Sequence, residues 1–493
     1  MLVLILRVIE KLLIIYFGVY LLVDLLMYAY ASGVFLFGRK RRKNDFSYED
    51  QRVSIIVPAY NEEVSIEACL HTMQGLDYPD YEIIVLNDGS TDGTMDRLMS
   101  LYDWEPYRLA PGELPVRPVR AAWKMPGRPV ILIDKANGGK ADAINAGINA
   151  ATGKYICTVD ADSVLDRDAL RHAVRPFLER EGTIVSGGQL AVLNGVEIRD
   201  NRIVNARVPR NLWVQWQIIE YIKSFLISRM AFSRINALLI MSGAFSVFRR
   251  RDLLEAGGFM SAVNNHPALV RYVGEGKQTV CEDMEIVVRL WRHARDRKRK
   301  AHAAFVPEAV CWTEVPDNPR FLFKQRARWH QGLGETLKWH RAMIFDPRYG
   351  ATGLIGMPYY LFFEFLSPVV KVLTLVFLVV ASVQGLVNTG WLLLLLAGII
   401  LLTAFVMASV TVIIEHWSRK AQNAGREALR YKTFGDWLQL IGAGILSEFT
   451  YAFFRIAAQL NGIYRFLRKR HEWNKFARRG VHIQKEKVKT ESG

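Results

Sequence analysis

Apolar residues are concentrated at the two ends of this chain, and this uneven distribution limits its possible folds more than any other feature. Residues 12–37 are almost wholly apolar and are followed by a basic run at 39–43. A helix needs about 20 apolar residues to cross a bilayer, and basic residues beside a span stay in the cytoplasm. We therefore expect a retained membrane anchor at 1–38, with a cytoplasmic segment after it.

The chain is strongly basic, with 64 Lys and Arg residues against 48 Asp and Glu and a net charge of +16. Such a charge suits either nucleic acid or the cytoplasmic face of a membrane. The basic runs at 38–44, 419–432 and 465–479 each flank an apolar segment. This arrangement favours a lipid bilayer as the partner and excludes a nucleic-acid binder.

The C-terminal third continues the membrane pattern. Asn388-Thr389-Gly390 is a turn signal between two apolar runs, 372–387 and 391–414. We expect a multi-pass protein of the cell (inner) membrane. The predicted segments are interfacial amphipathic helices at 318–368, a transmembrane hairpin at 369–415, a basic cytoplasmic loop at 416–433, transmembrane or interfacial helices at 434–467, and a basic cytoplasmic tail at 468–493.

The middle of the chain, residues 45–317, is typical of a cytoplasmic α/β domain. β-branched runs that predict strands alternate with helical patterns. We expect strands at 53–57, 81–86, 129–133 and 155–159 and helices at 62–73 and 140–151. This alternation predicts a parallel sheet, in which ligands bind beyond the carboxyl ends of the strands.

Two carboxylates, Asp160 and Asp162, directly follow the expected fourth strand. Mg²⁺ and Mn²⁺ are often bound by one or two carboxylates together with substrate phosphates. An Asp-x-Asp pair is also common in surface turns. Its position after a buried strand favours a metal and phosphate site.

Three further polar segments fit either a structural or a binding role. Pro58-Ala59-Tyr60-Asn61-Glu62 ends the first strand, and Asn87-Asp88-Gly89-Ser90 ends the second. Both suit turns and helix caps. Asn137-Gly138-Gly139-Lys140 precedes a helix, where backbone amides and a lysine can hold an anion. We expect a nucleotide contact there.

Two motifs lie on helices. Glu282 and Asp283 stand at an expected helix N-terminus, where acidic residues are favoured in any case. Gln325, Arg328 and Trp329 stand at i, i+3 and i+4 and so share one helix face. That face suits a sugar and a pyrophosphate, although Trp and Arg also anchor helices at membrane interfaces.

As a set, these motifs resemble the processive, membrane-integrated family-2 glycosyltransferases, which include cellulose, chitin, hyaluronan and poly-N-acetylglucosamine synthases. The resemblance runs from about 52 to 340 and comes nearest to the poly-β-1,6-N-acetylglucosamine synthases. The phrases at 137–147, 242–245 and 307–310 support it. It implies a GT-A fold, a UDP-sugar donor, a growing polysaccharide acceptor and Mg²⁺ or Mn²⁺. Accessory membrane or periplasmic subunits are possible partners.

The resemblance also implies residue roles. Asp283 would be the catalytic base, with Glu282 beside it. Asp162 and Asp160 would hold the metal. The other expected contacts are Pro58, Ala59, Tyr60, Glu62, Asp88, Lys140, Asp160, Gln325 and Arg328 for the nucleotide, and Ser242, Gly243, Ala244 and Trp329 for the acceptor.

Two other functions compete with a polysaccharide synthase. One is a non-processive transferase that glycosylates a lipid carrier, against which Gln325-x-x-Arg328-Trp329 argues. The other is a transporter or receptor with a nucleotide-binding domain. The expected hairpin spans contain no charged residue, so they offer no visible substrate path. The best single function is elongation of an exopolysaccharide from UDP-N-acetylglucosamine and its passage across the membrane.

Overall fold

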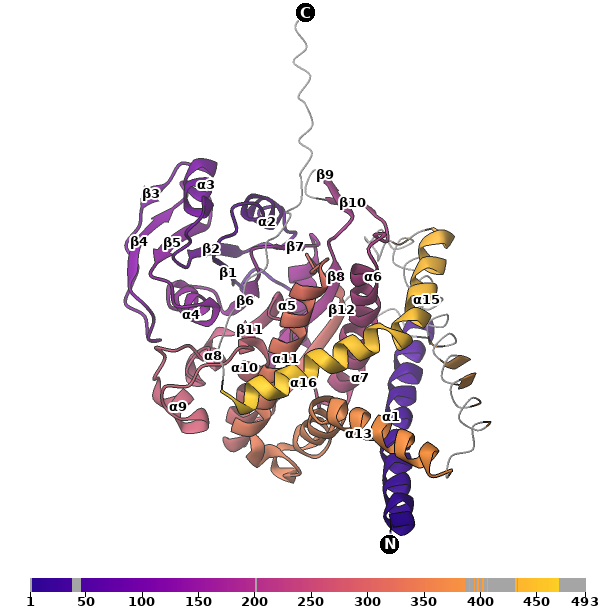
Figure 1. Ribbon diagram of the computed structural model, residues 1–493. Coiled ribbons are helices and arrows are strands. Elements are labelled where there is room, and N and C mark those ends of the chain that lie inside the picture. The colour runs from indigo at the N-terminus through magenta and orange to yellow at the C-terminus, as the bar shows by residue number, and fades with distance from the viewer. Residues whose placement is uncertain are drawn as a thin grey trace, which may run out of the picture.

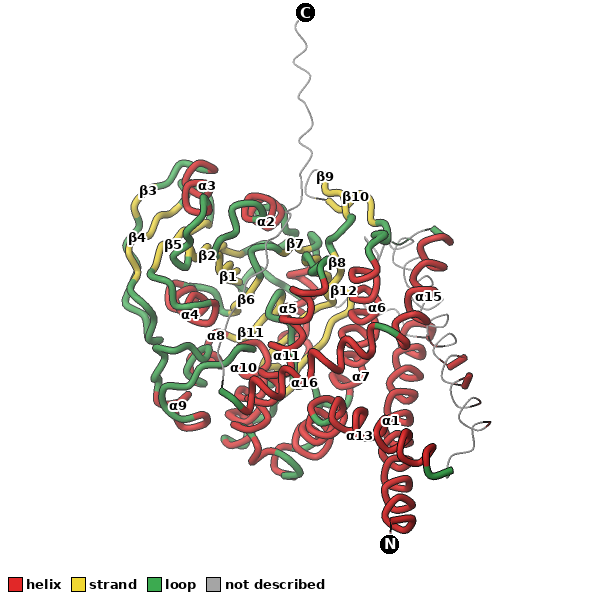
Figure 2. The backbone as a smooth tube through the Cα atoms, in the orientation of Figure 1, coloured by secondary structure: helices red, strands yellow, loops and turns green. Residues whose placement is uncertain are grey.

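The computed structural model describes residues 2–37, 46–199, 202–385, 431 and 433–469, together with scattered single positions between 390 and 406. Figure 1 shows a sheet with its covering helices on one side of the molecule and long helices on the other. Figure 2 shows the same division, with most strands gathered away from α1 (Leu2–Phe37).

The described strands form one large sheet and one small ribbon. The strands are β1 (Val53–Ala59), β2 (Tyr81–Asn87), β3 (Glu105–Pro106), β4 (Val119–Lys124), β5 (Val130–Lys135), β6 (Tyr155–Val159), β7 (Ser163–Leu165), β8 (Thr183–Val192), β9 (Val196–Arg199), β10 (Arg202–Ala206), β11 (Phe245–Arg249) and β12 (His302–Thr313). The ten-stranded sheet has the order β3-β4-β5-β2-β1-β6-β11-β8-β12-β7, and β9 pairs with β10.

The sheet is mixed rather than wholly parallel, which corrects the expectation from the sequence. β5, β2, β1 and β6 are parallel neighbours. β11 then lies antiparallel between β6 and β8. Residues 193–244, which join β8 to β11, are long enough to bring the chain back in either direction, so strand propensity in the sequence could not show which direction β11 takes.

Helices cover the sheet and extend beyond it. They are α2 (Ile66–Met73), α3 (Thr94–Leu101), α4 (Lys140–Ala150), α5 (Ala169–Glu179), α6 (Leu212–Glu220), α7 (Ser228–Arg234), α8 (Arg250–Glu255), α9 (Pro267–Val273), α10 (Glu282–Asp296), α11 (Pro319–Trp339), α12 (Met357–Tyr359), α13 (Ser367–Val383), α15 (Phe434–Phe449) and α16 (Tyr451–Leu467). Short 3₁₀ or π segments are η1 (Tyr221–Ile227), η2 (Arg341–Met343), η3 (Pro347–Tyr349), η4 (Thr352–Gly356) and η5 (Tyr360–Phe365).

Local sequence signals explain where α10 and α11 begin. α10 begins with Glu282 and Asp283 in its first turn and has basic residues in its last turn, which matches the helix dipole. Asn318 caps α11 by accepting a hydrogen bond from the amide of Arg320, and Pro319 occupies the first turn. α11 packs against α10 and α16, so protein contacts cover most of its C-terminal half.

One described helix is long and apolar enough to cross a membrane by itself, at Leu4–Val34 within α1. Two bent pairs pass the same test only when joined: Thr352–Phe365 with Ser367–Val383, bent by 46°, and α15 with α16, bent by 55°. In Figure 1, α1 stands apart from the sheet and α16 runs across the front of the molecule. The first apolar run of the expected hairpin largely coincides with α13, whereas most of the second lies outside the described residues.

Candidate active site

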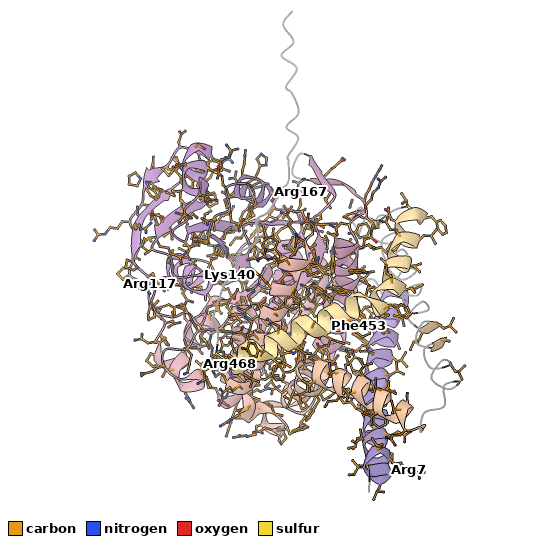
Figure 3. The ribbon with its side chains drawn as sticks, viewed as in Figure 1. Arg7, Arg117, Lys140, Arg167, Phe453 and Arg468 are labelled. Carbon is orange, nitrogen blue, oxygen red and sulfur yellow. The ribbon has the colours of Figure 1, made fainter. Side chains whose placement is uncertain are left out.

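One cavity of about 390 Å³ brings together every site residue expected from the sequence. It lies beyond the carboxyl ends of β1, β2 and β6, where the polar motifs follow the strands. The lining includes Pro58, Ala59, Tyr60, Glu62, Asp88, Lys140, Asp160, Asp162, Ser242, Gly243, Ala244, Glu282, Asp283, Gln325, Arg328 and Trp329. Figure 3 labels Lys140 in the interior of the molecule.

Asp88 is held at the end of β2 by a cation and two backbone amides. The Lys135 ammonium lies 2.5 Å from Oδ1, and the amides of Gly138 and Gly139 donate to the same carboxylate at 3.0 and 2.8 Å. Burial nevertheless raises the pKa of Asp88, because it outweighs these bonds. Gly89 adopts a φ of +66°, and a Cβ there would lie 2.9 Å from the Asn137 amide nitrogen. The turn after β2 therefore packs directly on the Gly138-Gly139 loop.

Lys140 joins the two acidic motifs across the cavity. Its ammonium lies 2.7 Å from Oδ1 of Asp160 and 3.1 Å from Oε1 of Glu282, and it donates to the carbonyl of Gly243 at 3.2 Å. A Cβ on Gly243 would lie 2.9 Å from this ammonium and 3.2 Å from Asp283 Oδ2. A side chain at position 243 would displace the Lys140 ammonium and crowd the Asp283 carboxylate, so Gly243 allows both groups to lie close to its backbone.

Glu282 and Asp283 are adjacent carboxylates with opposite pKa shifts. Burial and the neighbouring Glu282 raise the pKa of Asp283. Burial acts in the same direction on Glu282, but Lys140 and Arg328 outweigh it and lower the pKa of Glu282. Asp283 Oδ2 also accepts a hydrogen bond of 3.0 Å from the Gly243 amide. A half-buried carboxyl with a raised pKa, oriented by a backbone amide, has the properties of a general base.

The predicted face of α11 meets the cavity from the other side. Arg328 donates to the carbonyl of Val280 at 3.1 Å, beside the start of α10. The guanidinium of Arg326 lies over the Trp329 ring, 4.2 Å from its centroid. Gln325 accepts a hydrogen bond of 2.6 Å from Arg326. Gln325, Arg328 and Trp329 are all half-buried, as expected for groups that line a ligand cavity.

Sequence reasoning missed a buried polar cluster beside this face. Arg326 lies 2.6 Å from Glu220, which also accepts a hydrogen bond of 2.8 Å from the Tyr451 hydroxyl. Arg455 lies 3.9 Å from the same carboxylate. Arg455 and Gln459 of α16 line the cavity, so the C-terminal helices contribute to the site. A charged residue inside an apolar segment was the available signal.

A divalent metal fits the residues at the end of β6. Asp162 is buried and accepts a hydrogen bond of 3.1 Å from the Ser163 hydroxyl, and Asp160 also lines the cavity. Among the described residues, no three His, Cys, Asp or Glu side chains form a complete metal cage. Mg²⁺ and Mn²⁺ do not require one, because diphosphate oxygens and water complete their coordination.

A family model described as "Glycosyl transferase family 2" matches residues 54–256. These residues include the first three binding segments and both aspartates of the Asp-x-Asp pair. This chain carries a family 2 glycosyltransferase domain. The matched range ends before Asp283 and before α11. The roles expected for Asp283 and for the residues of α11 therefore rest on the resemblance of the longer segment, from about 52 to 340.

Two curated relatives are similar to more of the chain than the family 2 domain alone. The poly-beta-1,6-N-acetyl-D-glucosamine synthase of Staphylococcus epidermidis is 27% identical over 285 residues, which are 58% of this chain and 55% of that protein. The enzyme of the same name from Staphylococcus aureus strain COL is 25% identical over 298 residues, 60% and 58% of the two chains. The chain thus spans little more than half the length of these relatives.

The fold of the family 2 domain and its helices is similar to that of a solved structure, a mannosyltransferase of Pyrobaculum calidifontis in complex with GDP-mannose and Mn²⁺. The TM-score is 0.50 at 18% identity, over 94% of this chain and all of that one. This likeness concerns the fold alone. It confirms the GT-A fold expected from the sequence.

Proposed function

We propose that this protein is an inverting, processive glycosyltransferase that elongates an exopolysaccharide from UDP-N-acetylglucosamine. One observation carries the proposal: the half-buried Asp283 shares a single cavity with the nucleotide motifs of the sheet and with Trp329 of α11. The names of the two staphylococcal relatives support the same sugar and product. A transporter or receptor would have no need of a catalytic base between these groups.

In the proposed reaction, Asp283 accepts a proton from the acceptor hydroxyl. The hydroxyl oxygen then forms a bond to C1 of the donor sugar as the bond from C1 to the diphosphate breaks. A single displacement inverts the anomeric centre. The raised pKa of Asp283 brings it closer to the working pH, which suits a base.

The donor would lie along the carboxyl ends of the strands. The loop ends at Tyr60 and Asp88 suit the base of UDP, and Lys140 lies within reach of the phosphates. Gln325 and Arg328 face the same space and suit the leaving diphosphate. Asp160 and Asp162 would hold Mg²⁺ or Mn²⁺, which supplies positive charge to the leaving group. A Mn²⁺-bound complex of the solved mannosyltransferase is consistent with this use.

The acceptor would be the end of the growing polymer. Trp329 offers a ring on which a sugar can stack, and Ser242, Gly243 and Ala244 line the cavity beside Asp283. We place the protein in the cell membrane as a multi-pass protein, with α1 and the bent helix pairs in or on the bilayer. The polymer would leave across that bilayer, with or without accessory subunits.

The proposed topology puts residues 39–368 and the tail after 468 in the cytoplasm. Single cysteines can test it in intact cells with a membrane-impermeant reagent. The substitutions are Asp45→Cys, Lys485→Cys and Thr389→Cys, all outside the described residues. We expect labelling at 389 and none at 45 or 485. Labelling at 45 would overturn the topology.

The activity itself is tested with the purified full chain in detergent. UDP-sugars are offered singly, and any product is digested with linkage-specific hydrolases. We expect a long polymer from UDP-N-acetylglucosamine that a β-1,6-specific hydrolase degrades. Transfer of one sugar to a polyprenyl phosphate, with no polymer, would favour the lipid-carrier transferase instead.

A further inference from the structure

Arg229 is a buried cation that the proposed reaction leaves without a role. It lies in α7, directly after the π-helical segment η1, and only 6% of its surface is exposed. Its side chain lines the active-site cavity. Within the part of the chain that the structure describes, its Nη1 has no hydrogen-bond partner. A buried guanidinium nitrogen without a partner points to a ligand that supplies one.

Other buried arginines near the site are satisfied by the protein. Arg289, which is fully buried, binds the Glu285 carboxylate and the carbonyls of Ala256 and Gly258. Arg326 is paired with Glu220. Both of these arginines therefore stabilise the fold. Arg229 is different, because no described group accepts a hydrogen bond from its Nη1, and the contact with the Phe225 ring offsets only part of the cost of burying its charge.

The surroundings of Arg229 place it on the acceptor side of the cavity. Its guanidinium carbon lies 4.2 Å from the centroid of the Phe225 ring. That ring lies 6.1 Å from Trp329, between centroids. Three titratable groups interact electrostatically with Arg229. They are, from the strongest interaction to the weakest, Tyr360, Asp283 and Tyr221. None of the nucleotide motifs on the sheet is among them. Figure 1 shows α7 among the helices rather than at the sheet edge near β2.

The charges around this part of the cavity select the ligand. Glu282 and Asp283 stand close to the position of the reacting hydroxyl, and the unpaired cation faces aromatic rings. An anionic acceptor would be repelled by the two carboxylates. A neutral sugar meets no such repulsion, because its rings stack on aromatic faces and its oxygens accept hydrogen bonds.

We propose that Arg229 binds the acceptor, donating a hydrogen bond to a hydroxyl or N-acyl carbonyl oxygen of the sugar that stacks at Phe225 and Trp329. This inference rests on the proposed function. It assigns Arg229 a substrate contact, and it explains why the chain retains an unpaired buried cation. The π-helical segment η1 lies directly before α7, and such segments occur frequently at functional sites.

The test compares Arg229→Met and Arg229→Lys in the full chain, purified in detergent. The control is Arg251→Met, on an exposed arginine of α8 that is paired with Glu255. The acceptor probe is a β-1,6-linked N-acetylglucosamine tetrasaccharide, and UDP release is followed as a function of its concentration. UDP affinity, thermal unfolding and the pH profile are measured on the same samples.

For Arg229→Met we expect the acceptor KM to rise roughly 10- to 100-fold, the value of a hydrogen bond to a charged group. UDP affinity and the pH profile should stay unchanged. The melting temperature should change little, because the substitution removes the contact with the Phe225 ring but no hydrogen bond or ion pair to the described residues. Arg229→Lys should lie between Arg229→Met and the wild type, and Arg251→Met should match the wild type.

Three results would overturn the inference. A lower melting temperature with a normal acceptor KM assigns Arg229 to the fold. A shifted pH profile with a normal acceptor KM means that it acts through Asp283. An acceptor KM equal to that of the wild type removes the contact while the proposed function stands. If the wild-type chain itself transfers no sugar from any UDP-sugar, the proposed function fails first and the inference fails with it.

Discussion

The ammonium of Lys135 lies 2.5 Å from Asp88 and 2.6 Å from Asp142, with all three side chains buried. Asp88 also binds the amides of Gly138 and Gly139, and Asp142 lies in the first turn of α4. One cation thus fixes the end of β2 relative to the loop that carries Lys140. Burial makes these ion pairs sensitive to the loss of either partner.

Lys135→Met should therefore destabilise the protein and weaken donor binding together. Removing one partner of a buried ion pair costs about 3–5 kcal/mol. Chemical denaturation and UDP titration on the same sample measure both effects. Lys154→Met, on an exposed lysine that contacts Gln51, serves as the control and should change neither. A free energy of unfolding equal to that of the wild type in Lys135→Met would show that the ion pairs of Lys135 with Asp88 and Asp142 are not needed for stability.

Asp283→Asn should abolish transfer while UDP binding stays nearly intact. The amide has the same size and can still accept the hydrogen bond from Gly243, but it cannot take up the acceptor proton. A placed base contributes ~10²–10⁴-fold, so turnover should fall by that order. Steady-state UDP release gives the rate, and calorimetry gives the UDP affinity. Turnover close to that of the wild type would contradict the assignment of Asp283.

Activity should depend on Mg²⁺ or Mn²⁺ through Asp162. We expect EDTA to stop transfer and added Mn²⁺ to restore it, because Asp162 and Asp160 need a cation to hold the diphosphate. Asp162→Ala should lose the metal-dependent part of UDP binding, measured by titration with and without Mn²⁺. Full activity in excess EDTA would exclude the metal from the mechanism.

Trp329→Ala should lose polymer while it binds UDP normally. The ring is the stacking surface expected for the acceptor, and hydrolysis of the donor by water needs no such surface. Polymer length, donor hydrolysis and UDP affinity are compared on one monodisperse sample. Trp123→Ala removes a half-buried tryptophan of β4 that does not line the cavity, and it controls for the loss of an indole. Unchanged long-chain synthesis would favour the lipid-carrier transferase.

His330 should make the protein less stable in mild acid. Burial lowers the pKa of His330 to about 4, and its Nε2 lies 3.0 Å from the carbonyl of Phe365. In the unfolded chain the pKa of His330 is about 6.5, so the imidazole binds a proton more readily there than in the folded protein. Stability is therefore complete above that pH and falls as the pH drops toward 4.

We expect His330→Gln to remove about 2 kcal/mol of the loss in stability between pH 7 and pH 5. Glutamine can still donate to the Phe365 carbonyl but does not titrate. Thermal unfolding at the two pH values measures the difference. His71→Gln, on an exposed histidine, should behave as the wild type. An equal pH dependence in His330→Gln and the wild type would show that the pKa of His330 is the same in the folded and unfolded states.

Local patterns were sufficient to predict four neighbouring strands of the ten-stranded sheet, β5, β2, β1 and β6. The expected strands at 53–57, 81–86 and 155–159 correspond to β1, β2 and β6, each with its polar motif at the carboxyl end. The expected helix at 62–73 begins only at Ile66 in the structure. Buried strands need continuous β-branched runs, and parallel neighbours bring their ends together. Both properties can be read along the chain.

Tertiary structure decided what the sequence left open. The antiparallel β11, the pairing of Lys140 with Asp160 and Glu282, and the contribution of α16 to the cavity all join residues far apart in the chain. Arg229 carries no motif, and its lack of a partner became visible only once α7 was packed. The sequence determined which chemical groups stand at the ends of the strands, because propensity and periodicity are local. The pairing of the buried charges depended on burial and long-range packing. So did the position of Arg229, whose Nη1 has no partner among the described residues.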